Sequence, residues 1–406
     1  CLAGDSLVWT AAGAKPIKDV KKGDLVFTRH AGRLLLTEVL DQVCSGEKQT
    51  YTLRTKHRTL NLTAEHPVLI DRGGKNNVWK PVSEVKLGEK LVLAAKAPAT
   101  QSPPALGIHL SLLTEDPEVR VTERGAAALQ TRLRATQQYS RRDSGLGPKF
   151  QDLGVSRSTQ AELLEGRSSL KLSTLKQVFA ATDLPLFEGS YALKVEDPRL
   201  TLPDFVEPWF ARLFGFLLGD GWIAEGRISF ARGEYPELNE YYEGLFRRTG
   251  LEVSHSGDNS ATGGPTQAHI HSQAFEKVFR ALGWINGAHE KRLPPWIYTV
   301  SEEIRTEFLQ GFIDADGWGT YGDRYKHIEL CNEALLKDLK TLIDGLGFVS
   351  GQIRYREPRE ESRFINGREI RSNNGSYLLY FRMEPIAEGA EFFSEAVESI
   401  DHRKVE

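Results

Sequence analysis

Two aspartates in this 406-residue sequence lie in closely matched apolar segments. Asp220 belongs to Leu-Phe-Gly-Phe-Leu-Leu-Gly-Asp-Gly-Trp (213–222), and Asp316 belongs to Leu-Gln-Gly-Phe-Ile-Asp-Ala-Asp-Gly-Trp (309–318), 96 positions later. Carboxylates suit hard divalent cations such as Mg²⁺, and such a cation activates water against a phosphodiester. A single apolar helix that stops at Asp-Gly is usually only a helix end. Two matched copies at a domain-sized spacing instead predict one shared metal site.

The segments that carry these aspartates are predicted to be α-helices. Pro208 favours the start of the first helix, and Ser301-Glu-Glu offers an N-cap and an acidic first turn to the second. Gly215 and Gly311 lie about a turn and a half before the aspartates. Two helices with facing glycines can approach closely, so we expect the two aspartates to lie together at the base of a pseudo-symmetric saddle.

Each apolar segment is followed by the same succession of patterns. A strand-like run comes first, then an amphipathic helix (238–248 and 333–346), then Gly-Leu-Glu-Val-Ser or Gly-Phe-Val-Ser. Residues 205–385 are therefore predicted to form two tandem α/β units of about one hundred residues each.

Residues 205–385 resemble a single-chain LAGLIDADG homing endonuclease, in which two motif helices form the internal interface and supply one catalytic acid each. The resemblance implies that Asp220 and Asp316 are catalytic and bind Mg²⁺ or another divalent cation. Asp314 matches an earlier, non-catalytic aspartate of the motif, where the first copy has Leu218. The implied activity is a metal-dependent double-strand break in DNA.

The resemblance also implies a catalytic lysine shortly before the second motif helix. Lys291 matches it, and its implied role is to polarise the scissile phosphate or the attacking water; taken alone, it would be a solvated surface lysine. Basic residues after the motif aspartates are expected to contact phosphates or base edges in a salt-dependent complex, although each alone is equally well a plain surface charge. They are Arg227, Arg232, Arg324, Lys326, Arg354 and Arg356.

Residues 1–98 are predicted to be all-β, because short runs rich in Val, Leu, Ile and Thr alternate with Gly or Asp turns. The segment Pro-Ile-Lys-Asp-Val-Lys-Lys-Gly-Asp-Leu-Val (16–26) recurs 65 residues later as Pro-Val-Ser-Glu-Val-Lys-Leu-Gly-Glu-Lys-Leu-Val (81–92). This echo predicts two related β subdomains around a pseudo-twofold axis.

The same region resembles the first two splicing blocks of inteins, within the Hint superfamily, through Cys1-Leu-Ala-Gly-Asp and Thr63-Ala-Glu-His-Pro67. The resemblance implies that Cys1 attacks the preceding carbonyl in an N-to-S acyl shift, a step that suits a nucleophilic thiol. It implies that His66 protonates the leaving amide nitrogen or destabilises the scissile bond, and that Thr63 hydrogen-bonds the strained amide. Without the resemblance, His66 would be a turn histidine.

The end of the chain departs from the intein pattern. Residues 386–406 are expected to return to the splicing domain, but they close on Asp401-His402 and four further residues rather than on a terminal His-Asn. We expect either a separate C-terminal intein fragment or a deliberately shortened chain. The gap would also weaken thioester formation at Cys1, because the missing strands complete the same active site.

A basic insert separates the two regions, beyond a Pro/Ala/Ser-rich linker at 95–104. Residues 119–178 carry eleven Lys or Arg against five Asp or Glu. Within 145–185, Gly154 and Ser156 stand where a helix-turn-helix has its turn and the cap of its next helix. Similar sequences occur in repressor-type domains, and a small structural helical bundle is equally compatible. We favour an accessory DNA-binding module over 119–190, in which Arg157 and Arg167 contact DNA.

Composition limits the remaining choices. The chain is 40% hydrophobic and 26% charged, and it has no apolar run near the roughly 18 residues of a membrane span. Three cysteines are too few for a disulfide framework, which favours a reducing, cytoplasmic setting; Cys44 and Cys331 are interpreted as buried or incidental thiols. We expect a monomer without membrane contact.

The sequence thus predicts a multidomain fold: an all-β Hint splicing domain, a helical basic insert, and an α/β LAGLIDADG endonuclease with two pseudo-symmetric repeats. Its expected partners are the double-stranded DNA of the intein-free allele and the flanking host-protein segments. One alternative is a DNA-binding protein whose nuclease and splicing centres are both inactive; retention of Asp220 and Asp316 argues against it. A hedgehog-like autoprocessing domain is another, and 205–385 has no place in it.

Overall fold

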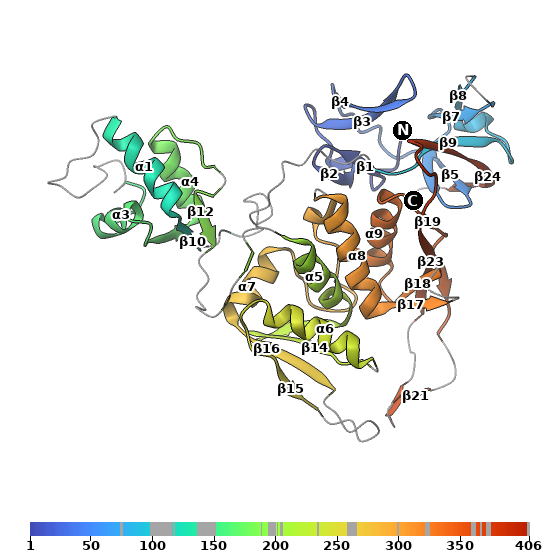
Figure 1. Ribbon diagram of the computed structural model, residues 1–406. Helices are drawn as coiled ribbons and strands as arrows, with labels where there is room; N and C mark the ends of the chain where they lie inside the picture. Colours follow the sequence, from blue (N-terminus) through green and yellow to red (C-terminus); the bar gives the residue numbers. More distant parts are fainter. Residues whose placement is uncertain are drawn as a thin grey trace.

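The computed structural model forms three bodies: a β region at the two chain ends, an insert, and a larger α/β region (Figure 1). The described residues are 1–73, 76–97, 116, 118–135, 152–187, 189–193, 200, 202–203, 206–233, 235–257, 266–298, 300–320, 325–358, 363–365, 368–370 and 375–403. Arg324 and the linker residues 98–104 lie outside this set.

The N-terminal region is built from two antiparallel sheets, as its alternation of β-branched runs and turns predicts. One sheet has the order β2-β1-β3-β4 and the other β6-β5-β24-β9-β7-β8. The strands are β1 (Leu7–Thr10), β2 (Gly13–Pro16), β3 (Leu25–His30), β4 (Arg33–Glu38), β5 (Thr50–Thr55), β6 (Thr59–Thr63), β7 (Pro67–Asp71), β8 (Val78–Pro81), β9 (Lys90–Ala94) and β24 (Phe392–Arg403).

The 65-residue sequence echo corresponds to a repeated local structure. In each copy a strand ends at a proline, Pro16 or Pro81, and a short 3₁₀ turn follows, η1 (Ile17–Asp19) or η2 (Val82–Glu84). Both turns are closed by the amide of the next valine. The two copies sit in different sheets, which agrees with two related β subdomains.

The last described strand belongs to the N-terminal region. β24 pairs with β9 through 392–396 and with β5 through 397–403. The side chain of Glu395 from β24 accepts hydrogen bonds from Thr55 Oγ1 (2.6 Å) and from the His57 backbone amide (3.2 Å), and its carboxylate contacts the His57 ring. Sequence-distant segments therefore build one sheet.

The insert has its own core, formed by residues such as Leu129, Leu163 and Phe179. The sequence predicts its helices but not its three-stranded antiparallel sheet, which has the order β11-β10-β12. The insert's elements are β10 (Glu118–Val121), α1 (Glu123–Ala135), α3 (Arg157–Leu164), β11 (Ser169–Lys171), α4 (Leu172–Ala181) and β12 (Tyr191–Leu193).

The α/β region contains two similar units around one shared aromatic and aliphatic core. In each unit a long helix runs directly into a strand of an antiparallel sheet, and further helices cover that sheet. The first unit comprises α5 (Pro208–Asp220), β13 (Gly221–Ala224), β14 (Arg227–Ala231), α6 (Pro236–Arg247), β15 (Ser254–Ser256), β16 (Gln267–His271) and α7 (Gln273–Ala281). The second comprises η4 (Pro295–Tyr298), α8 (Glu302–Asp316), β17 (Gly317–Thr320), β18 (Tyr325–Leu330), α9 (Glu333–Gly345), β19 (Phe348–Ser350), β20 (Arg354–Arg356), β21 (Arg363–Ile365), β22 (Arg368–Ile370) and β23 (Ser376–Pro385).

A buried lysine joins the α/β region to the β region. The Lys340 ammonium on α9 donates to the His57 carbonyl (2.9 Å), to Asp344 Oδ2 (3.0 Å) and to Ser350 Oγ (2.7 Å). Asp344 also accepts a hydrogen bond from Arg58 Nη1 at 2.8 Å. Burial lowers the pKa of Lys340, and the neighbouring Asp344 carboxylate opposes that effect. The two regions are therefore held by paired charges across their boundary.

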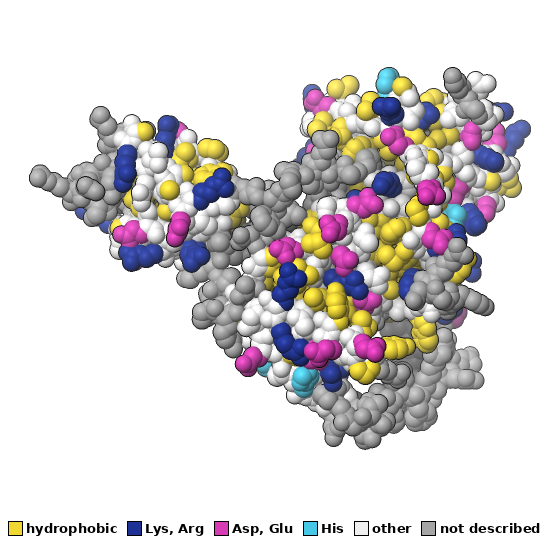
Figure 2. Space-filling view, in the orientation of Figure 1, with side chains coloured by type: hydrophobic (Ala, Val, Ile, Leu, Met, Phe, Trp, Pro, Cys, Tyr) yellow, Lys and Arg dark blue, Asp and Glu magenta, His cyan; other side chains and the backbone are white. Residues whose placement is uncertain are grey.

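The described part of the face seen in Figure 2 has no single basic patch, because its Lys and Arg side chains are interspersed with Asp and Glu. Among the described helices, none combines the length and apolar character of a membrane-spanning segment.

Candidate functional site

Helices α5 and α8 lie side by side at the centre of the α/β region (Figure 1). Their backbones come close at the two predicted glycines. A Cβ atom on Gly215 would lie 2.1 Å from the Phe308 carbonyl oxygen, and one on Gly311 would lie 2.0 Å from the Arg212 carbonyl oxygen. Both distances exclude any side chain, which confirms the close approach predicted from the spacing of the small residues.

Both helices end in the same way. Asp220 and Asp316 are the last helical residues, and each is followed by an extended glycine that starts a strand. A Cβ on Gly221 or Gly317 would lie 2.5 Å from the carbonyl oxygen of Leu217 or Ile313, four residues earlier. The Asp-Gly step therefore lets the chain turn directly from helix to strand and leaves each aspartate at the helix end.

The two aspartates and Lys291 form one electrostatic cluster. The pKa of Asp220 is raised to about 7, mainly by burial and secondly by the nearby Asp316 carboxylate, while Lys291 opposes the shift. Burial also raises the pKa of Asp316 against the same lysine. The pKa of Lys291 is lowered by burial, and the two aspartates counteract this. The three predicted nuclease residues thus lie together, with unfavourable carboxylate repulsion.

The donor set fits a divalent cation. Within the described residues, neither aspartate carboxylate accepts a hydrogen bond, so their oxygens remain available as ligands. A Cβ on Gly219 would lie 3.2 Å from Asp316 Oδ2, which places that carboxylate against the end of the partner helix. The described residues contain no cluster of three or more His, Cys, Asp or Glu side chains suited to a metal. A cation here would therefore draw on two carboxylates and on ligands from outside the protein, as substrate-bridging Mg²⁺ commonly does.

Lys291 is fixed by contacts that the sequence did not reveal. Its ammonium donates to the carbonyl oxygens of Gly219 (2.9 Å) and Gly221 (3.1 Å), which flank the first aspartate. The carbonyl of Lys291 accepts a hydrogen bond from Asn332 Nδ2 at 2.8 Å. The next residue, Arg292, donates two hydrogen bonds of 2.6 and 2.8 Å to the Asp338 carboxylate of α9. The ammonium is thus held beside both carboxylates.

Asp314 has a structural role across the helix pair. Its Oδ2 accepts hydrogen bonds from Arg212 Nη2 (2.6 Å) and Nε (3.1 Å) on α5 and from the Tyr242 hydroxyl (2.6 Å). Arg212 also pairs with Glu307 at 2.9 Å. This network contains a half-buried guanidinium and crosses the α5–α8 interface. Sequence reasoning identified Asp314 as non-catalytic but missed Arg212, its partner.

The predicted DNA-contacting basic residues have different environments. Arg227 and Arg354 are exposed, and Lys326 is half-buried. Arg356 pairs with Glu329 at 2.9 Å. Arg232 pairs with the buried Glu243 at 3.0 Å, which commits much of its guanidinium to the fold. The predicted Arg324 lies outside the described residues.

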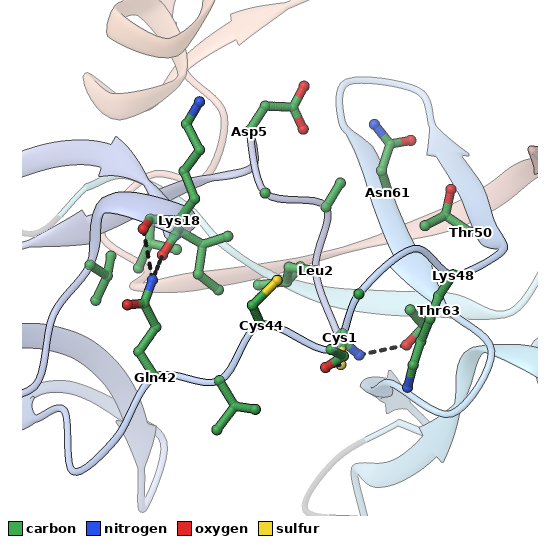
Figure 3. Close-up of a pocket in the computed structure, with 18 of the residues that line it drawn as sticks. Cys1, Leu2, Asp5, Lys18, Gln42, Cys44, Lys48, Thr50, Asn61 and Thr63 are labelled. Carbon is green, nitrogen blue, oxygen red and sulfur yellow. Dashed lines mark hydrogen bonds between the residues drawn. The ribbon is translucent and has the colours of Figure 1, made fainter. Parts of the chain in front are cut away.

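The predicted splicing residues gather at the edge of the β region. The Cys1 amino group donates to Thr63 Oγ1 at 2.5 Å, and the Thr63 amide donates to the Cys1 carbonyl at 2.9 Å (Figure 3). The pKa of His66 is lowered, first by burial and then by the positive charge of the Cys1 amino group, with Glu65 opposing. The structure thus brings Cys1, Thr63 and His66 together.

Cys1 also borders a cavity of about 1080 Å³. Its Sγ lies 3.0 Å from Ser45 Oγ. Cys44 lines the same cavity and is exposed, so it is not a buried thiol; Cys331 is half-buried. The cavity leaves open space beside the Cys1 thiol.

The insert has the local geometry of the predicted turn and cap. Gly154 has a φ of +75°, which favours glycine, and Ser156 Oγ accepts the Thr159 amide at 3.1 Å as N-cap of α3. Arg157, at the first turn of α3, is exposed. Arg167 is exposed too, and it contacts Glu165. The first helix of the expected helix-turn-helix falls outside the described residues.

Comparison with curated proteins gives relatives that are themselves much longer. No protein-family model matches the chain. An iron-sulfur cluster assembly SufBD family protein of Mycobacterium leprae is 24% identical over 358 residues, which are 86% of this chain and 32% of that protein. The DNA polymerase II large subunit of Thermococcus kodakarensis is 25% identical over 349 residues, which are 81% of this chain and 17% of that protein. The chain thus spans a third or less of these relatives.

Two kinds of solved structure are similar to part of the chain. A variant of the Ssp DnaB mini-intein is 30% identical over 25% of this chain and 65% of that chain, with a TM-score of 0.21. The homing endonuclease I-DmoI is 14% identical over 44% of this chain and 90% of that chain, with a TM-score of 0.31. The structural neighbours therefore include the Hint-type and the LAGLIDADG classes, each over part of the chain.

Proposed function

We propose that the α/β region is a site-specific homing endonuclease that makes a double-strand break in DNA, and that the β region is a protein-splicing domain of an intein. The observation that carries the nuclease half is the convergence of Asp220, Asp316 and Lys291 at the ends of two glycine-crossed helices. A DNA-binding protein with inactive centres would have no need of two desolvated, mutually repelling carboxylates at the ends of the paired helices.

The aspartates would hold Mg²⁺ or another divalent cation, which supplies Lewis-acid activation of a water and of the scissile phosphate when bound. The protein's own groups position that chemistry. The carboxylates of Asp220 and Asp316 lie near each other at the ends of two helices. The Lys291 ammonium, anchored on the Gly219 and Gly221 carbonyls, offers positive charge to a phosphate oxygen. A solved structure of I-DmoI contains DNA and Ca, which supports both a DNA partner and a divalent ion.

The splicing half rests on Cys1 and Thr63. In a precursor, the Cys1 nitrogen would be the amide of the scissile peptide bond, and Thr63 Oγ1 at 2.5 Å would be its hydrogen-bond partner. The thiol would attack the preceding carbonyl, the C–N bond would break, and the nitrogen would take up a proton to give a thioester with a free amine. His66, whose pKa is lowered, would act as that proton donor or strain the bond.

The names of the relatives fit an inserted element. An iron-sulfur assembly protein and a DNA polymerase subunit have unrelated roles, yet each matches more than four-fifths of this chain over a minor part of its own length. A segment carried within unrelated host proteins gives this pattern. Flanking host-protein segments are the partners that this proposal implies.

The nuclease is tested on a plasmid that carries the intein-free allele of the chain's own host gene. We expect Mg²⁺-dependent linearisation that stops with EDTA and falls at least a hundredfold in Asp220→Asn and in Asp316→Asn. The matched control is Asp183→Asn, at a surface aspartate of the insert whose side chain is 83% exposed. Cleavage that persists in the double variant Asp220→Asn/Asp316→Asn would refute the assignment.

The splicing half is tested by adding a C-terminal fragment that ends in His-Asn to the chain fused behind a reporter domain. We expect ligated flanks with the wild-type chain and none with Cys1→Ala. Thr63→Val should slow the first step while leaving the fold intact. Equal ligation in wild type and Cys1→Ala would contradict the proposed role of the thiol.

We propose further that the insert is an accessory DNA-binding module, with α3 as the helix that contacts DNA. Support comes from the Gly154 turn, the Ser156 cap and the exposed Arg157. Arg157→Ala should weaken DNA binding and reduce its salt dependence while leaving cleavage of saturating target unchanged. A gel-shift titration at two salt concentrations measures this effect, and no change in affinity would favour a structural bundle.

A further inference from the structure

The open face of the second sheet carries a row of aromatic rings beside the aspartate pair. Trp318 of β17 pairs in register with His327 of β18, which pairs with Tyr380 of β23. The neighbouring row contains Ile328 and Leu379, which are fully buried against the helices. Because successive side chains of a strand point to opposite faces, the aromatic row points away from the helices.

These rings lie next to one another, with the half-buried His327 between two exposed rings. Trp318 is 71% exposed and Tyr380 is 40% exposed. The Trp318 and His327 rings are stacked, with centroids 6.2 Å apart at 14°, and the His327 and Tyr380 centroids are 5.4 Å apart. Within the described chain, His327 Nδ1 is buried without a hydrogen-bond partner. Large exposed apolar groups of this kind mark binding surfaces, since covering them releases water from apolar area.

The equivalent row of the first sheet is different. There Trp222 pairs with Ser229, which pairs with His269. Ser229 and His269 are buried, and His269 Nδ1 hydrogen-bonds Ser229 Oγ at 2.8 Å, while its Nε2 contacts Ser256 Oγ. The first row is a closed polar cluster, and the second is an open aromatic surface. The two repeats therefore offer unlike surfaces at matching positions.

We propose that Trp318, His327 and Tyr380 determine specificity by contacting thymine methyl groups in the major groove of one half of the DNA target. This inference rests on the proposed nuclease function. The thymine C5-methyl is the apolar group that the major groove displays, and exposed aromatic rings on a sheet are suited to cover it. The row starts two residues after Asp316, so the base pairs it contacts lie close to the cleaved phosphates, on the side bound by the second repeat.

The test compares wild type with Trp318→Ala on a plasmid library randomised across the target. We expect Trp318→Ala to lose a thymine preference in one half-site only, while Trp318→Phe retains it. The matched control is Trp222→Ala, at the equivalent position of the first repeat, which should leave that half-site's preference unchanged. Binding is measured separately in the non-cleaving Asp220→Asn background. Replacing the contacted thymine by uracil should weaken binding about fourfold, the factor for one buried methyl group, and should have no effect with Trp318→Ala.

The outcomes distinguish a failure of the proposed aromatic surface from a failure of the nuclease assignment. If wild type cleaves the target and Trp318→Ala keeps every base preference, with uracil equal to thymine in both proteins, the aromatic surface does not read DNA and the nuclease assignment stands. If wild type neither binds nor cleaves any library member in Mg²⁺, the nuclease assignment falls and the proposed surface falls with it. Loss of preference in both half-sites would show a general folding defect and would also overturn the half-site assignment.

Discussion

The strongest prediction from the aspartate cluster concerns stability rather than cleavage. In the absence of divalent cations, Asp220→Asn should make the folded protein more stable at neutral and higher pH. Burial and the neighbouring Asp316 raise the pKa of Asp220 from 3.8 to about 7. This difference means that ionisation of Asp220 lowers the free energy of unfolding by about 4 kcal/mol.

The pH dependence follows from the direction of that shift. Well below pH 4 both the folded and the unfolded chain carry the proton, so the residue does not alter stability. As pH rises from 4 to 7 the unfolded chain releases the proton first, and the free energy of unfolding falls. Above pH 7 the full loss of about 4 kcal/mol is present. A neutral amide avoids it, at a cost of about 1 kcal/mol for a buried group without partners.

The assay is urea unfolding in EDTA at pH 8 and pH 5, followed by near-ultraviolet circular dichroism. We expect Asp220→Asn to gain about 3 kcal/mol at pH 8 and less than about 1 kcal/mol at pH 5. Asp183→Asn should match wild type at both. A variant less stable than wild type at pH 8, or a gain independent of pH, would refute the reasoning about the buried pair.

Three further predictions concern the elements that position the site. Gly311→Ala should destabilise the protein by about 3 kcal/mol or more, because the new Cβ would lie 2.0 Å from the Arg212 carbonyl oxygen. Gly244→Ala, at an open helical position, should instead stabilise the protein by up to about 1 kcal/mol. Thermal melts of both variants test this difference. Asp314→Ala should cost about 1–3 kcal/mol in chemical unfolding, because it removes the main hydrogen-bond partner of the half-buried Arg212 guanidinium, and a neutral result would contradict the network. Lys340→Met should loosen the boundary between the two regions and split calorimetric unfolding into two transitions; one unchanged transition would contradict its bridging role.

Local patterns predicted the main positions of the nuclease site. Helix periodicity, the repeated glycine and the Asp-Gly step are all short-range signals. They placed Asp220 and Asp316 at helix ends, and the matched copies indicated that the helices meet. The 65-residue echo predicted two related β subdomains, and its two copies have the same succession of strand and 3₁₀ turn.

Features that depend on distant partners were not predictable. Arg212 finds Asp314 across 102 positions, and nothing in either local pattern marks the pair. Arg232 follows a motif strand as a DNA contact would, but α6 brings the buried Glu243 against it. The strands of the insert escaped notice because β10 and β12 are short and pair with each other across about seventy intervening residues.

Manganese binding is the most direct test of whether Asp220 and Asp316 hold one cation between them, because Mn²⁺ replaces Mg²⁺ at carboxylate sites and scatters anomalously. In crystals of the protein soaked with Mn²⁺, we expect an anomalous peak about 2.2 Å from oxygens of both Asp220 and Asp316, and we expect this peak to be lost in Asp316→Asn. Peaks confined to other residues, or a peak that contacts only one of these aspartates and survives in Asp316→Asn, would contradict a cation shared across the helix pair.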